Sequence, residues 1–206
     1  MIREAYPFVI PALVVCFGAS AASSIFDSAP LAFLSVAAAI LTLFFAYFFR
    51  DPERTTPGEV GVIVSAADGR VTKVEERADC FFVSVFLSPL DVHINRSPIG
   101  GRITRVEYIK GKKGPATTDV SSLENERNSI TIEGDGVQVV CTQIAGLVAR
   151  RIVCWKKEGD VLRAGERFGL IKFSSRTDLL IPKTHRVSVK VGDRVRGGES
   201  IIARRS

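Results

Sequence analysis

A pair of serines separates two apolar runs near the end of the chain, in the segment IKFSSRTDLLIP. Each run carries the β-branched and large apolar residues that are typical of a strand. Ser174 and Ser175 therefore lie in a short connection between two predicted strands. Whether this pair performs chemistry decides between an enzyme and a scaffold.

A second cluster of reactive side chains lies in the segment LSPLDVHINRSP, beside two turn prolines. Asp91 and His93 are two residues apart, so in an extended segment their side chains would point to the same side. Such a histidine is either structural or a general acid or base. The other histidine of the chain, His185, follows IPKT and is expected in a surface loop.

Asp68 precedes a glycine in VSAADGRV. Taken alone, this pair predicts an Asp-Gly hairpin turn. The chain has no glycine-rich phosphate loop and no nucleophile elbow. Its four cysteines include no CxxC pair, so we expect reduced thiols without a zinc site or disulfide framework. Reduced thiols favour a cytoplasmic setting.

The first 50 residues predict a membrane-anchoring helical hairpin. Residues 5–26 and 30–49 carry no charge, and each stretch has the roughly 20 residues that cross the hydrocarbon core. Arg3 and Arg50 flank the pair, so the positive-inside rule places both ends and the rest of the chain on the cytoplasmic face of the cell membrane. A cleaved signal peptide and a buried hairpin in a soluble core are less favoured alternatives.

Residues 51–206 read as short strands rich in β-branched residues, with Gly-Asp pairs at the turns. No long apolar period of 3.6 residues is present. This part is therefore predicted to be mainly β, as an antiparallel β-barrel or sandwich domain.

One motif, K-x-G-D-x-x-R-x-G-E, occurs at residues 157–166 and again at residues 190–199. Its turns resemble those of biotinyl- and lipoyl-type sandwiches, in which two hairpins pair about a pseudo-twofold axis. A carrier domain of that type usually has its modified lysine beside methionine, and Met1 is the only methionine here. The hairpin architecture is therefore expected without the carrier function.

The formal net charge of +6 suits an anionic membrane or substrate. Nucleic acid is not an expected partner, because the basic residues are dispersed and no nucleic-acid motif accompanies them. A homo-oligomer remains open.

Five motifs occur in order along the chain: SAADG, FLSPLDVHINRSP, NER, QIAGLVARRI and KFSSRTDLLIP. Together with FFRDPER they resemble the phosphatidylserine decarboxylase family in its short bacterial and archaeal form. The resemblance covers nearly the whole chain. It implies a pyruvoyl-dependent lyase of phospholipid biosynthesis that converts phosphatidylserine to phosphatidylethanolamine and CO2.

The resemblance also implies a zymogen that matures by autocatalytic cleavage between Ser174 and Ser175. The products would be a β chain of residues 1–174 and an α chain of residues 175–206. Ser175 would become a covalent pyruvoyl group. The amine of the serine headgroup would form a Schiff base with its ketone, which serves as an electron sink.

The roles of individual residues follow from the same resemblance. Asp68 matches the acidic residue that supports self-cleavage, and His93 matches a histidine implicated in decarboxylation. Three basic residues are candidates for binding the phosphate of the substrate, or alternatively are solvated strand residues: Arg96, Lys172 and Arg176.

Two positions depart from the family pattern. Ser174 stands where the family usually has glycine, which tolerates backbone angles that a Cβ resists. Slower cleavage, no cleavage, and a cut shifted to the bond between Phe173 and Ser174 are the open outcomes. Arg96 replaces the second histidine of longer members, so either Asp68 acts without a histidine or His93 serves both steps.

Two rival functions stay open at this point. An archaetidylserine decarboxylase would perform the same headgroup chemistry on an ether lipid. An uncleaved, membrane-tethered β scaffold or lipid-binding protein would remain one chain without a carbonyl group.

Overall fold

The computed structural model describes residues 2–111, 125–146, 151–173 and 175–206. It divides into two compact units, residues 1–52 and 53–206. Each unit is described by itself.

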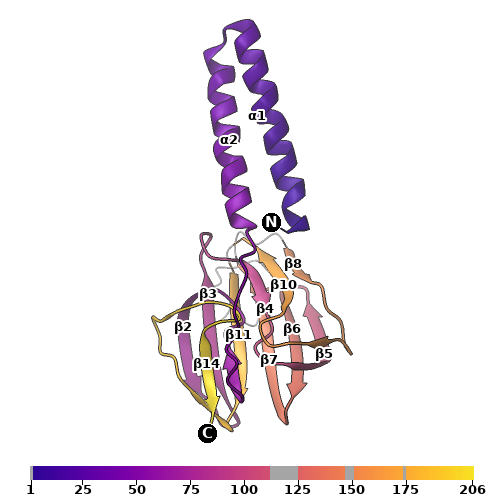
Figure 1. The fold of residues 1–206 in the computed structure, drawn as a ribbon, viewed down its shortest axis with the longest axis vertical. Helices are drawn as coiled ribbons and strands as arrows, with labels where there is room; N and C mark the ends of the chain where they lie inside the picture. Colours follow the sequence, from indigo (N-terminus) through magenta and orange to yellow (C-terminus); the bar gives the residue numbers. More distant parts are fainter. Residues whose placement is uncertain (1, 112–124, 147–150, 174) are drawn as a thin grey trace. The chain divides into compact units, whose positions relative to one another are not determined.

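The first unit is a helical hairpin (Figure 1). A short 3-10 turn, η1 (Arg3–Ala5), leads into α1 (Tyr6–Phe26), and α2 (Ala29–Phe48) runs beside it. Asp27 ends α1 in the left-handed conformation, with a φ of 45°. The Ser35 hydroxyl of α2 donates a hydrogen bond of 3.0 Å to the Cys16 carbonyl of α1. The two helices predicted from the sequence are therefore confirmed.

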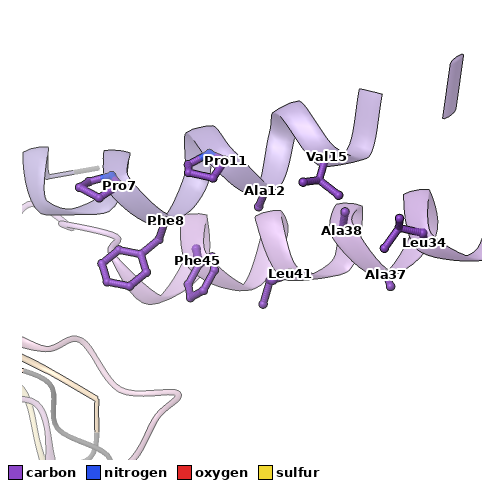
Figure 2. A pocket seen from close by; sticks show the side chains of 10 residues that line it. All are labelled: Pro7, Phe8, Pro11, Ala12, Val15, Leu34, Ala37, Ala38, Leu41 and Phe45. Carbon is purple, nitrogen blue, oxygen red and sulfur yellow. The ribbon is translucent and has the colours of Figure 1, made fainter. Parts of the chain in front are cut away.

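Most of the outward surface of this hairpin is apolar. Large side chains such as Phe17, Phe33 and Leu43 are at least 70% exposed. Both helices are long and apolar enough to cross a membrane by length and composition. A groove of about 450 Å³ lies between them. Its lining consists of proline, alanine, phenylalanine and aliphatic side chains, which Figure 2 shows. Continuous apolar surface of this kind is unfavourable in water.

The described residues of the second unit form fourteen strands in three antiparallel sheets. The strands are β1 (Val62–Val64), β2 (Gly69–Glu76), β3 (Cys80–Leu87), β4 (Ile94–Arg96), β5 (Gly101–Ile109), β6 (Arg127–Gly134), β7 (Val137–Ala145), β8 (Arg151–Cys154), β9 (Val161–Leu162), β10 (Arg167–Lys172), β11 (Ser175–Pro182), β12 (His185–Val187), β13 (Arg194–Val195) and β14 (Ile201–Arg205).

The largest sheet has eight strands in the order β13-β2-β3-β11-β7-β6-β5-β9 and curls into a half-barrel (Figure 1). Two smaller sheets have the orders β1-β14-β12 and β4-β10-β8. Alternate residues of the large sheet, such as Val85, Ile132 and Leu179, are buried in one continuous apolar core. The prediction of a mainly β, antiparallel domain is confirmed.

The prediction for His185 was wrong. It is the first residue of β12, opposite Arg205 of β14, and its side chain is buried. Nδ1 lies 3.0 Å from the Thr184 hydroxyl. Burial, followed by the nearby Arg205 charge, lowers the pKa of His185.

The repeated sequence motif forms the same turn twice. The carboxylates of Asp160 and Asp193 each accept the backbone N–H of the lysine three residues earlier, at 2.9 and 3.0 Å. In each turn the glycine N–H donates to a strand of the large sheet, Gly159 to Ile103 and Gly192 to Val71. The repeat in the sequence is therefore also a repeat in the structure. The likeness to biotinyl- and lipoyl-type sandwiches stays a prediction.

This duplication extends to the whole unit. The order of the large sheet is symmetric about its centre, with β11 matched by β7, β3 by β6, β2 by β5 and β13 by β9. The sheet β1-β14-β12 is matched by β4-β10-β8. Both β2 and β5 carry an irregularity after their second pair. The unit thus consists of a first half (β1–β3 and β11–β14) and a second half (β4–β10), related by a pseudo-twofold axis.

Candidate functional site

Ser175 begins β11, one of the two central strands of the large sheet. It lies opposite Leu87 of β3 and Ala145 of β7 and is fully buried. Among the residues that the structure describes, none forms a hydrogen bond with its Oγ. A buried hydroxyl without a partner costs about 1–3 kcal/mol. Stability therefore does not explain a serine at this position.

The chain reaches Ser175 through a strained backbone. Phe173 has a φ of 65°, in the left-handed region that side chains with a Cβ rarely adopt. Such a conformation costs on the order of 1–3 kcal/mol and is concentrated at functional sites. Ser174, the other residue of the predicted cut, lies outside the described residues. A buried hydroxyl next to strained backbone is the arrangement that acyl transfer to a hydroxyl requires.

His93 lies just before β4 and is 2% exposed. Its Nδ1 is 2.9 Å from the carbonyl oxygen of Asp91. Because a carbonyl only accepts, Nδ1 carries the hydrogen, and in the neutral ring Nε2 is then the basic nitrogen. The His93 carbonyl accepts the N–H of Ile171 at 3.2 Å. This bond places His93 against β10, the strand that leads to Ser175.

The hydrogen bond of His93 to Asp91 is to its backbone carbonyl. The Asp91 carboxylate accepts hydrogen bonds from the Ser88 N–H and hydroxyl, at 2.8 and 2.7 Å. Both residues precede β4, so the extended segment that would align their side chains is not formed. The carboxylate stabilises the turn after β3 instead.

Asp68 lies between β1 and β2, with both carboxylate oxygens engaged. Oδ2 accepts from Arg54 Nη2 at 2.6 Å, and Oδ1 accepts the Gly197 N–H at 2.8 Å. Burial raises the pKa of Asp68, and the Gly197 N–H and the Arg54 guanidinium only partly oppose this. A carboxylate with a raised pKa is a stronger base once it is ionised.

The glycine after Asp68 is required by a close approach to β3. Gly69 has a φ of 148°, and a Cβ there would lie 2.1 Å from the Phe86 carbonyl oxygen. The Asp-Gly hairpin interpretation is therefore wrong, because β1 pairs with β14 while β2 pairs with β3. Phe86 pairs in turn with Arg176. Asp68 is thus held near the end of β3 that faces Ser175.

A polar cavity of about 540 Å³ opens beside Asp68. Charged side chains of both signs line it: Asp68, Asp91, Arg194, Arg196 and Glu199. Ser175 is not among its lining residues. The cavity brings together Asp68 and Asp91 from distant parts of the sequence.

The three candidate phosphate-binding residues have different environments. Arg96 is buried, and its Nη1 donates to the Gly165 carbonyl at 3.1 Å. It lines a second cavity, of about 420 Å³, with three other arginines: Arg54, Arg163 and Arg167. Lys172, the last residue of β10, is half-buried.

For Arg176 the alternative of a solvated strand residue was wrong. It forms a buried ion pair of 2.9 Å with Asp178, on the face of β11 opposite Ser175. Burial raises the pKa of Asp178, and the Arg176 charge partly opposes this. Binding of substrate phosphate by Arg176, Arg96 or Lys172 stays a prediction.

Sequence reasoning missed Arg54 as a member of the site. Its guanidinium bridges Asp68 and Glu199, at 2.6 and 3.0 Å, and is 9% exposed. The motif FFRDPER, which contains it, was the available signal. Its partners are distant in sequence, so only the folded chain identifies them.

Comparison with known proteins agrees with this geometry. The family model described as phosphatidylserine decarboxylase matches residues 41–203. Phosphatidylserine decarboxylase proenzymes of Syntrophus aciditrophicus and Solibacter usitatus are 41% and 45% identical, over 96% and 94% of this chain and 94% and 93% of the relatives. The proenzyme of Ruegeria pomeroyi is 47% identical over 79% of this chain and 80% of its own length. This chain belongs to the phosphatidylserine decarboxylase family.

Proposed function

We propose that this chain is a membrane-anchored, pyruvoyl-dependent decarboxylase that converts phosphatidylserine to phosphatidylethanolamine and CO2. The observation that carries the proposal is the buried Ser175 hydroxyl, without a partner among the described residues and just beyond the left-handed Phe173. The names of the relatives support the substrate.

Maturation starts when Ser175 Oγ attacks the carbonyl carbon of residue 174. The hydroxyl proton passes to a base, the C–N bond breaks, and an ester joins the two residues. Elimination then removes the Cα proton of residue 175 and breaks its Cβ–Oγ bond, which frees the carboxylate of residue 174 and leaves dehydroalanine. Water replaces the nitrogen of residue 175, which leaves as ammonia. We assign Asp68 as the base because it matches the acidic residue that supports self-cleavage in the family, and a raised pKa suits its carboxylate to take up a proton.

The new pyruvoyl group supplies an electrophilic ketone that withdraws the electrons released as CO2 departs. The backbones of β3 and β7 hold residue 175 from both sides. His93 either binds the substrate carboxylate or, once protonated on Nε2 as well, donates that proton to the carbon that CO2 leaves, while the Asp91 carbonyl fixes the ring through Nδ1.

The substrate is a lipid whose headgroup carries an ammonium, a carboxylate and a phosphate. The mixed-charge cavity beside Asp68 suits such a headgroup better than it suits a simple anion. The apolar helical hairpin would hold the catalytic unit at the bilayer, on the cytoplasmic face that Arg3 and Arg50 predict.

The decisive experiment is the intact mass of the denatured protein, before and after treatment with a carbonyl reagent. We expect a chain of residues 1–174 and a chain of residues 175–206 that begins with a pyruvoyl group and gains the mass of the reagent. The Ser174→Gly chain is measured beside it, because glycine is the family's residue here. A single uncut mass from both chains would contradict the proposal.

Replacing Arg54 by glutamine should move the acid limb of the pH profile of self-cleavage to higher pH. Cleavage needs ionised Asp68, so its rate falls as the pH drops through the pKa of Asp68. Arg54 lowers that pKa, so its removal raises the pKa and the protonated form persists to higher pH. Single-turnover cleavage, followed by denaturing gel from pH 4 to 9, measures the shift.

Arg54→Lys is the matched control, because it retains a positive charge beside Asp68. Its acid limb should lie between those of the parent and Arg54→Gln. A uniform loss of rate at every pH in Arg54→Gln would show that Arg54 acts on the fold and not on the ionisation of Asp68.

A further inference from the structure

A continuous row of buried polar side chains crosses four strands of the second unit. Asn128 of β6 donates to Gln143 of β7 at 3.0 Å, and Gln143 donates to Asn95 of β4 at 2.8 Å. Asn95 donates to the Thr177 hydroxyl of β11 at 2.9 Å. Each of these residues is at most 2% exposed. We call these four residues the amide row.

Two members of the amide row each lie two residues along the chain from a predicted catalytic position. Thr177 lies two residues after Ser175 on β11, and Asn95 lies two residues after His93. Thr177 is paired with Gln143 across β7, as Ser175 is paired with Ala145. The hydrogen bond between Asn95 and Thr177 therefore joins the strand that follows His93 to the strand that Ser175 begins.

The pseudo-twofold axis provides an internal control for this row. Asn95 pairs with Gly169 in β10, and its counterpart Ile63 pairs with Ala203 in β14. Thr177 pairs with Val85 in β3. The counterpart of Val85 is Ile132, which pairs with Val139. The full set of counterparts, read from the same registers, is Ile63 for Asn95, Val139 for Thr177, Ile181 for Gln143 and Phe81 for Asn128.

All four counterparts are apolar and belong to the main core or pack against it. Ser175 itself corresponds to Val137, at the start of β7. A buried polar network seldom stabilises a core more than apolar residues of similar volume do. The same scaffold thus forms without polar side chains where no reaction occurs. The polar residues therefore occupy only the set of four positions next to Ser175 and His93, and the counterpart set is apolar.

The backbone leaves room for the row at one glycine. A Cβ on Gly169 would lie 3.0 Å from the Gln143 amide nitrogen and 2.3 Å from the Val153 carbonyl oxygen. The counterpart of Gly169 is Ala203, which packs in the apolar core. Because Gly169 has no Cβ, the amide nitrogen of Gln143 can lie close to the backbone of β10.

We infer that Asn95, Gln143 and Thr177 are positioning residues for the proposed decarboxylation. They hold β4 and β11 at a fixed separation, so that His93 and the group derived from Ser175 keep their relative placement after the chain is cut. The inference rests on the proposed function. It predicts that the row serves turnover and not the stability of the fold.

The test replaces the whole row by its own counterparts, in the variant Asn95→Ile, Thr177→Val, Gln143→Ile, Asn128→Phe. We expect a thermal midpoint equal to or above that of the parent, with kcat at least tenfold lower. Midpoints are compared in chains that also carry Ser175→Ala, so that cleavage does not differ. A parent-like kcat would overturn the inference, and so would an unfolded variant, because the row would then serve the fold.

Thr177 alone gives a second, milder test. Thr177→Val keeps the side-chain shape and removes the acceptor for Asn95, so kcat should fall severalfold with KM nearly unchanged, while Thr177→Ser should restore the parent kcat. An equal fall in kcat in Thr177→Val and Thr177→Ser would overturn the inference. Failure of the proposed function is distinguishable, because the parent and its Ser174→Gly form would then remain uncut.

Discussion

Replacement of Ser175 by alanine should abolish self-cleavage and decarboxylation without lowering the free energy of unfolding. The substitution removes the oxygen that attacks residue 174, and no pyruvoyl group can form without it. It breaks no hydrogen bond among the described residues, because Oγ has no partner there. Removing a buried, unpaired hydroxyl is neutral or stabilises by about 1 kcal/mol. Loss of function without loss of stability would identify Ser175 as a chemical residue.

The measurement combines intact mass, reaction with a carbonyl reagent, and the thermal midpoint. Ser188→Ala is the control, since this hydroxyl lies beyond the end of β12 and accepts an exposed hydrogen bond of 3.3 Å from Arg204. It should cleave as the parent does. Cleavage of the Ser175→Ala chain at the bond between Phe173 and Ser174 would contradict the assignment and support the shifted cut.

The elements of the catalytic unit could be predicted where the local pattern is strong. The apolar, β-branched run from Thr177 to Pro182 identified most of β11, and the two uncharged stretches identified both helices. The two-residue strands β9 and β13 were missed. Two residues are too few to form a pattern that predicts a strand. The positions of β9 and β13 depend instead on the preceding Gly-Asp turns, which form hydrogen bonds to Ile103 and Val71.

The internal duplication was only partly visible in the sequence. The turns at residues 157–166 and 190–199 keep their residues, because glycine and aspartate make the same backbone bonds in both. Residue types also repeat in β2 and β5, where G-R-(V/I)-T-(K/R)-V-E occurs at residues 69–75 and again at residues 101–107. Asn95 matches Ile63, and Thr177 matches Val139, so the polar residues of the amide row are not repeated in the sequence.

The site itself depends on contacts between residues distant in sequence. The resemblance assigned Asp68, but its hydrogen bond from Gly197 spans 129 positions of the chain. The pattern around Asp68 alone predicted a local turn, because a short window contains no information about β3. Arg176 was predicted either to bind substrate phosphate or to be a solvated strand residue. Its burial could not be predicted, since it arises from the packing of the folded sheet and from Asp178.

Substitution of His93 by asparagine should leave self-cleavage intact and lower kcat for decarboxylation by about 10²- to 10⁴-fold, the usual loss when a general acid or base is removed. The asparagine amide can replace Nδ1 as the donor to Asp91, so the turn is kept while Nε2 is lost. Cleavage is followed by intact mass and decarboxylation by CO2 release from phosphatidylserine in detergent micelles.

His185→Asn is the matched control, because His185 is the other histidine of the chain and is also buried. It lies in β12 and is not a member of the amide row, so its loss should lower the thermal midpoint and leave kcat nearly unchanged. Loss of cleavage in His93→Asn would mean that His93 serves both steps. That result would assign to one histidine the work that longer members divide between two, and would explain how Arg96 can replace the second.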